Sequence, residues 1–215
     1  MIEHAIGVDC VCTVRIGVLV SGNGSNLQAL IDAETRGDLA PGTIAVVVAN
    51  KPNIPALARA AAAGVASELV EHAGLERVEF ERRLIIALDR HGVEALVLAG
   101  FMRVLTAGFV ARYPLRIVNT HPSLLPAFPG HDAVAQAIVH GVKVTGVTVH
   151  FVDASLDGGP IIAQVAVSVD EGEGASSLHA KIQHEEHRLL PAIIQRLAAG
   201  RLSCQGRRVV GERAE

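Results

Sequence analysis

The sequence is poor in aromatic residues, with no tryptophan, one tyrosine and five phenylalanines among 215 residues. Half of the residues are apolar, so alanine, valine, leucine and isoleucine must build the core, and the length favours one large domain over two small ones. No apolar run approaches the ~20 residues that a membrane-spanning helix needs. The net charge of -3 gives no basic surface, so we expect neither nucleic acid nor membrane as a partner.

Cysteine is also scarce. Cys10, Cys12 and Cys204 are an odd number at the two ends of the chain, which argues against a disulfide framework or a zinc site. We therefore expect reduced thiols and a cytoplasmic location. Residues 1–13 lack the basic segment and apolar core of a secretory signal, and we expect a short, poorly ordered extension there.

Short apolar runs alternate with helical patterns along the rest of the chain. Strands are expected at 15–21, 43–49, 66–70, 95–99, 115–121, 144–152 and 161–169, and helices from 25 onward, at 55–63, 77–91, 133–140 and 175–199. This alternation predicts a single α/β domain over 14–202, a Rossmann-like three-layer sandwich with a mostly parallel sheet. The last two strands are close in sequence and should form an antiparallel edge near the C-terminus. Residues 203–215 are expected to be a charged, frayed tail.

A glycine-rich turn follows the first strand. Gly22 and Gly24 permit unusual backbone angles, and Ser25 or Asn26 can cap the next helix, whose first N–H groups attract anions such as phosphate. A dinucleotide-binding fingerprint needs a third glycine where Leu27 stands, and no Walker G-K-[ST] is present. A simple phosphate cradle remains, with a plain tight turn as the alternative.

Polar residues end a buried strand at Asn119, Thr120 and His121. Ligands of open α/β sheets bind outside the carboxyl ends of the strands, and alternate residues of a strand point the same way, so Asn119 and His121 should project together into a cleft. An amide beside an imidazole can stabilise a developing oxyanion and move protons near neutral pH. The alternative is that Asn119 caps a turn and His121 is a satisfied core histidine.

Other features favour the catalytic interpretation. Asp157 precedes Gly158-Gly159-Pro160 on a tight turn, and it would stabilise a His121 imidazolium if the fold brings the two together. His150 is expected to face the same cleft. The loop after His121 is made rigid by a glycine and three prolines, at positions 122, 126, 129 and 130.

The last predicted helix carries several polar residues. His184 and His187 do not form an H-E-x-x-H motif, and an exposed charged face explains them, so we expect no metal. Gln183 and Glu186 share a face of this helix and could reach a polar ligand at the edge of the sheet.

With these residues assembled, the chain closely resembles the glycinamide ribonucleotide formyltransferase family, folate-dependent enzymes of purine synthesis. The similarity runs from about Arg15 to Leu202, through V-L-V-S-G-N-G-S-N-L-Q, L-A-G-F-M-R-V-L, I-V-N-T-H-P-S-L-L-P-A-F-P-G, G-V-T-V-H-F-V-D and L-D-G-G-P-I-I-A-Q. It implies transfer of a formyl group from the co-substrate 10-formyltetrahydrofolate to the amine of 5-phosphoribosyl-glycinamide (GAR).

The resemblance also implies roles for individual residues. The catalytic residues would be Asn119, His121 and Asp157, with His150 in support. The contacts to the phosphate and the rest of GAR would come from Gly24, Ser25, Asn26, Gly100, Gln183 and Glu186. The folate contacts would come from Arg77, Met102, Arg103, Val104, Leu105, Asn119, Val152 and Asp153. His131 follows Pro129-Gly130 directly, one residue earlier than in relatives, and is left out of the catalytic set.

Two other functions fit parts of this pattern. A formyltetrahydrofolate deformylase would use a similar trio but let water attack, and a non-catalytic phosphate-binding α/β module would account for the glycine turn alone. Deformylases normally carry an extra N-terminal domain and methionyl-tRNA formyltransferases an extra C-terminal domain, and we expect neither here. The sequence is compatible with a monomer or a homodimer.

Overall fold

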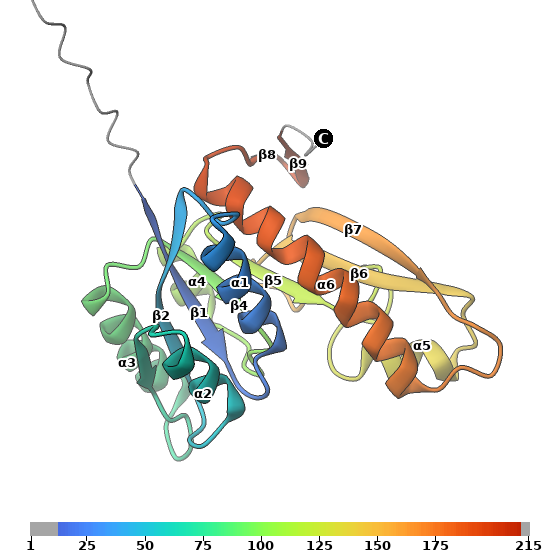
Figure 1. The fold of residues 1–215 in the computed structure, drawn as a ribbon, viewed down its shortest axis with the longest axis horizontal. Helices are drawn as coiled ribbons and strands as arrows, with labels where there is room; N and C mark the ends of the chain where they lie inside the picture. The colour runs from blue at the N-terminus through green and yellow to red at the C-terminus, as the bar shows by residue number, and fades with distance from the viewer. Residues whose placement is uncertain (1–12, 212–215) are drawn as a thin grey trace, which may run out of the picture.

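The computed structural model describes residues 13–211, so residues 1–12 of the expected N-terminal extension lie outside the described part of the chain. A seven-stranded sheet in the order β3-β2-β1-β4-β5-β6-β7 forms the centre (Figure 1). Its strands are β1 (Val14–Val20), β2 (Gly42–Ala49), β3 (Ser67–Leu69), β4 (Ala95–Leu98), β5 (Ile117–His121), β6 (Val144–Phe151) and β7 (Ile161–Ser168). The helices are α1 (Ser25–Arg36), α2 (Pro55–Ala62), α3 (Arg77–Arg90), α4 (Ala107–Arg112), α5 (Ala133–Val139) and α6 (Ala175–Ala198).

The sheet is mixed in the way that the sequence predicted. The strands from β3 to β5 pair in parallel, whereas β6 pairs antiparallel with both β5 and β7. The prediction of a single Rossmann-like α/β domain with an antiparallel edge is therefore confirmed. None of the helices between residues 13 and 211 is long and apolar enough to cross a membrane.

The two faces of the sheet bury different kinds of side chain. Helices α1, α2 and α6 cover one face with a core that is aliphatic apart from Phe151. Helices α3 and α4 cover the other face, where Phe80 stacks on Phe101 with ring centroids 6.4 Å apart and Phe109 lies beside Tyr113. The few aromatic residues are thus concentrated where a short helix must fill space against the sheet, because each ring buries a large area.

The position of a binding crevice follows from the strand order. The chain places β2 and β3 on one side of β1 and then crosses to β4 on its other side, so the winding direction reverses between β1 and β4. Ligands of doubly wound sheets bind at such a switch point. Ser21 and Met102, which follow these two strands, are joined here by a hydrogen bond from the Met102 N–H to the Ser21 hydroxyl oxygen, 2.9 Å long.

The structure differs from the sequence prediction after Leu202, where a frayed tail was expected. Residues Ser203–Gln205 (β8) and Arg208–Val210 (β9) form an antiparallel hairpin beside the C-terminal end of α6 (Figure 1). Leu202, Cys204 and Val209 pack against the aliphatic core. Alternating apolar residues in this segment give the hairpin one half-buried face, which its charged residues obscured in the sequence.

Helix α4 was also missed. Its N-terminus is capped by Thr106, whose side-chain oxygen accepts a hydrogen bond from the Phe109 N–H at 3.2 Å. The buried carboxylate of Glu81, on α3, accepts hydrogen bonds from both the N–H and the hydroxyl of Thr106. This contact between α3 and the start of α4 fixes the far end of the apolar segment 101–105.

Candidate active site

The predicted catalytic residues surround a single cavity of about 630 Å³ at the carboxyl edge of β4 and β5. Asn119 and His121, on β5, line this cavity together with His150 from β6 and Asp157 from the loop before β7. The volume is within the usual range for small-molecule sites. The cavity lies beside the switch point between β1 and β4, because Gly100 and Met102 form part of its wall.

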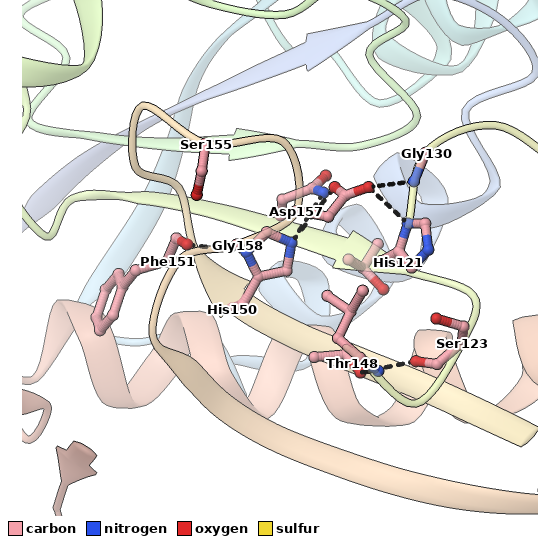
Figure 2. A network of polar contacts seen from close by, with 12 residues as sticks. His121, Ser123, Gly130, Thr148, His150, Phe151, Ser155, Asp157 and Gly158 are labelled. Carbon is pink, nitrogen blue, oxygen red and sulfur yellow. Dashed lines mark hydrogen bonds and ion pairs between the residues drawn. The ribbon is translucent and has the colours of Figure 1, made fainter. Parts of the chain in front are cut away.

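Asp157 lies between two histidines (Figure 2). Its Oδ2 atom is 3.4 Å from Nδ1 of His121, and its Oδ1 atom is 3.8 Å from Nε2 of His150. The backbone N–H of Gly130, in the proline-rich loop, donates a 2.8 Å hydrogen bond to Oδ2. The side chain is only 10% exposed. The carboxylate therefore accepts a hydrogen bond from the Gly130 N–H, faces Nδ1 of His121 and is shielded from bulk water.

The turn that carries Asp157 requires a glycine at position 159. Asp157 has a φ of 49°, in the left-handed region, where side-chain hydrogen bonding favours aspartate and asparagine over most residues. A Cβ atom on Gly159 would collide with the backbone carbonyl of Phe151, whereas one on Gly158 would meet only the Ser155 side chain, which can rotate away. Gly159 thus lets the turn approach the end of β6 closely enough to place Asp157 beside His121.

Both ring nitrogens of His121 face oxygen acceptors. Nδ1 faces Asp157, and Nε2 lies 2.8 Å from the carbonyl oxygen of Phe128. A carbonyl can only accept, so Nε2 carries a proton, and a second proton on Nδ1 would satisfy Asp157 as well. Each ring nitrogen of His121 therefore has one oxygen acceptor within reach. To donate from Nε2 to a substrate, His121 would have to break its hydrogen bond to the Phe128 carbonyl oxygen.

His150 holds the amide of Asn119. Its Nδ1 atom donates to the Phe151 carbonyl at 2.8 Å, so in the neutral ring Nε2 accepts from Nδ2 of Asn119 at 3.2 Å. Burial lowers the pKa of His150, and this lower pKa favours the neutral ring. The hydrogen bond to the Phe151 carbonyl and the charge of Asp157 act in the opposite direction. One N–H of the Asn119 amide is thereby hydrogen-bonded to His150, and this bond fixes the direction of the other N–H.

The predicted folate residues form the apolar wall of the cavity. Met102 and Val104 are 55% and 50% exposed, which is unusual for large apolar residues and typical of a binding surface. Arg103, Leu105, Val152 and Asp153 also line the cavity, whereas Arg77 is an exposed residue at the start of α3 outside its lining. The folate contacts of all these residues, including Arg77, remain predictions.

The predicted phosphate turn lies next to the cavity rather than in its lining. Gly24, with a φ of 75°, precedes α1, and the Ser25 hydroxyl lies 3.5 Å from Nε2 of Gln183. The buried carboxylate of Glu186 links the two regions: it accepts hydrogen bonds from Nδ2 of Asn26 at 3.4 Å and from the hydroxyl of Thr120 at 3.0 Å. Burial raises the pKa of Glu186, and these two hydrogen bonds oppose the increase.

Several cavity residues were not among the predicted site residues. They include Thr120, Leu156, Asp132, His179 at the start of α6, and His131, which the sequence analysis had set aside. Thr120 lies between the two predicted catalytic residues of β5, so its position in the motif was a usable signal. His179 is brought to the cavity only by the packing of α6, for which the sequence carries no local signal.

Comparisons with known proteins identify the family of the chain. The formyl transferase family matches residues 14–194. The phosphoribosylglycinamide formyltransferase of Escherichia coli (strain K12) is 43% identical over 190 residues, which cover 88% of this chain and 89% of that protein. The crystal structure of glycinamide ribonucleotide transformylase 1 from Symbiobacterium toebii is 46% identical and covers 93% of this chain and 94% of its own, with a TM-score of 0.90.

A solved deformylase is also similar but more distant. The formyltetrahydrofolate deformylase from Burkholderia mallei ATCC 23344 is 28% identical, with a TM-score of 0.85 over 94% of this chain and 71% of that one. The match to the family covers most of the sequence, including both the glycine turn and the residues of β5, β6 and the Asp157 loop. This chain belongs to the formyl transferase family.

Proposed function

We propose that this protein is a phosphoribosylglycinamide formyltransferase, which transfers the formyl group of 10-formyltetrahydrofolate to the amine of GAR in purine biosynthesis. The observation that carries the proposal is the meeting of Asn119, His121 and Asp157 in one cavity next to the glycine turn at the start of α1. Relatives of that name, with identities of 40–43%, are matched over most of their length.

The substrates fit the two ends of the site. The phosphate of GAR is assigned to the start of α1 at Gly24, Ser25 and Asn26, since free N–H groups at a helix start attract anions. Gly100, Gln183 and Glu186 are assigned to the remainder of the nucleotide. The pteridine of the folate is assigned to the apolar wall from Met102 to Leu105 and to the segment that contains Val152 and Asp153.

In the first chemical step, the amine of GAR attacks the formyl carbon and a tetrahedral centre with a negative oxygen forms. Asn119 donates to this oxygen the N–H that His150 leaves free. Such a donor, already oriented before the reaction, costs no reorganisation when the charge develops. Loss of one donor of this kind typically lowers the rate by about 10²–10³.

In the second step, a proton leaves the attacking amine and another reaches the departing folate nitrogen. His121, with a water molecule, carries this transfer, and protonated His121 adds a second donor to the negative oxygen after its bond to Phe128 is exchanged. Asp157 favours the charged ring and fixes its orientation. The scheme uses no nucleophilic side chain of the protein.

The decisive experiment measures loss of 10-formyltetrahydrofolate with and without GAR. Loss that depends on GAR supports formyl transfer. Loss at the same rate without GAR would instead indicate a deformylase, which the similarity to the Burkholderia mallei structure makes the relevant alternative. No loss under either condition would leave only a phosphate-binding module and would contradict the proposal.

A further inference from the structure

The turn that is assigned to the phosphate is built against α2. Gly24 has no side chain because α2 leaves no room: a Cβ atom there would lie 2.7 Å from Cβ of Ala56 and 2.9 Å from its Cα. The Ala56 N–H also donates to the Gly22 carbonyl at 3.2 Å. The first turn of α2 therefore serves as a template for the backbone between β1 and α1.

Arg59, one helical turn further along α2, contacts the same segment with its whole guanidinium. Nε donates to the Asn23 carbonyl oxygen at 2.9 Å, one terminal nitrogen donates to the Asn23 side-chain oxygen at 3.3 Å, and the other donates to Oε1 of Gln28 at 3.2 Å. These three acceptors are neutral oxygens. Among residues 13–211, no carboxylate oxygen lies within 4.0 Å of this guanidinium, so Arg59 forms no ion pair with them.

The bond to the Asn23 carbonyl has a consequence for the adjacent N–H. The peptide between Asn23 and Gly24 is planar and trans, so its C=O and N–H point in opposite directions. Because Arg59 holds this carbonyl oxygen, the Gly24 N–H points away from the Arg59 guanidinium. Without this bond the peptide could rotate and present its carbonyl oxygen in place of the N–H.

A second, independent feature indicates that a polar ligand belongs at this helix start. Asn26 is 8% exposed, and its side-chain Oδ1 atom is buried without a hydrogen-bond partner, while its Nδ2 atom donates to Glu186. Buried polar atoms are normally satisfied, and an amide oxygen only accepts, so this atom fits a bound molecule that brings a hydrogen-bond donor, such as a hydroxyl of the phosphorylated substrate rather than the phosphate itself.

We propose that Arg59 is a positioning residue for the phosphate group of the phosphorylated amine substrate. It holds the turn so that the N–H groups of Gly24, Ser25 and Asn26 are available together, and its unpaired charge adds a favourable potential for a dianion. The inference rests on the proposed function for the identity of the substrate, and on the contacts of Arg59 for the role itself.

The test uses the full chain with Arg59→Gln, Arg59→Lys and, as a matched control, Arg36→Gln. Arg36 is at the opposite end of α1, where it forms an exposed ion pair with Asp38, and its replacement changes the net charge equally. For Arg59→Gln we expect the KM for GAR to rise about 10- to 100-fold, as for the loss of hydrogen bonds from a charged group, with the KM for folate unchanged and kcat within about threefold. Arg59→Lys keeps the positive charge but loses the planar set of N–H donors, so its KM for GAR should lie between those of the wild type and Arg59→Gln.

Binding of inorganic phosphate gives a readout that does not need the reaction. Its dissociation constant, measured by calorimetry, should rise in Arg59→Gln by a factor similar to that of the KM for GAR, and should not change in Arg36→Gln.

A KM for GAR within twofold of wild type, or an equal rise in the KM for folate, would overturn the proposal. If Arg59→Gln fails to fold, Arg59→Lys decides by the same criteria. If the wild type transfers no formyl group, the proposed function fails while the phosphate measurement still tests Arg59.

Discussion

The carboxylate of Asp157 lies 3.4 Å from Nδ1 of His121, although helix α5 and strand β6 separate the two residues in the sequence. Strand β6 runs antiparallel to β5, so it ends with Phe151 opposite Val118, and the loop after β6 leads back along β5 towards His121. The following turn then places Asp157 against the end of β5 (Figure 2).

Asp157→Asn should lower kcat by at least about 10²-fold, because the neutral amide no longer favours the imidazolium form of His121. The side chain is nearly isosteric, so the fold should remain intact. Steady-state kinetics and circular dichroism measure the two effects, with the exposed Asp170→Asn as the control. Turnover near that of the wild type in folded Asp157→Asn would remove the aspartate from the mechanism.

Asn119→Ala should lower kcat by about 10²–10³ with a much smaller effect on the KM for either substrate, since the lost donor acts on charge that develops in the transition state. His150→Phe should reproduce part of this loss, because it removes the acceptor that orients the amide. Comparison of the two single variants with the double variant measures their coupling. Fully additive effects would show that His150 does not act through Asn119.

Glu186→Gln should make the protein more stable at neutral pH and a poorer enzyme. Because burial raises the pKa of Glu186, the folded state holds this proton more tightly than the unfolded chain. The resulting stabilisation is present below the unfolded value of about 4.5 and is lost as pH rises through the folded pKa. Glutamine removes the buried charge, so we expect a higher melting temperature, by roughly 2–4 °C for each kcal/mol by which the free energy of unfolding increases.

The same substitution should raise the KM for GAR if Glu186 contacts the nucleotide. Thermal unfolding from pH 4 to pH 8 should show the stability of the two proteins diverging as pH rises. Parallel stability curves would show that Glu186 does not titrate differently in the folded state, and an unchanged KM for GAR would remove it from the predicted substrate site.

Arg207→Ala should lower kcat by about two- to fivefold without a change in either KM. Arg207 is in the connection of the β8–β9 hairpin, and its guanidinium donates a 2.7 Å hydrogen bond to the carbonyl oxygen of Gly158, next to Asp157. The bond is exposed, so a modest effect is expected. Arg208→Ala is the control because it removes the same charge from the neighbouring position; an equal effect in both variants would indicate a general effect of charge.

Local patterns in the sequence were sufficient for most of the architecture. Apolar runs and helical periodicity located the seven strands of the main sheet, and the alternation along β5 placed Asn119 and His121 at the cavity. The contacts that depend on tertiary packing could not be predicted in this way. The link from Thr120 through Glu186 to Asn26 joins three separate elements, and neither the spacing nor the residue types of the sequence specify it.

The missed elements have a common physical cause. Helix α4 is six residues long and is stabilised by Thr106 and by Glu81 from another helix, so its own periodicity is too short to detect. The β8–β9 hairpin depends on burial of Leu202, Cys204 and Val209 against a core that is assembled from the rest of the chain. In both cases tertiary contacts outweigh the local propensity of the segment.

The most direct test of the central claim follows the formyl carbon itself. When 10-formyltetrahydrofolate that carries ¹³C in the formyl group is incubated with the protein and GAR, the label should appear by NMR in an amide of formyl-GAR. Omission of GAR should leave the labelled folate unchanged. Appearance of the label in free formate, at a rate that does not depend on GAR, would contradict the assignment of the site to formyl transfer.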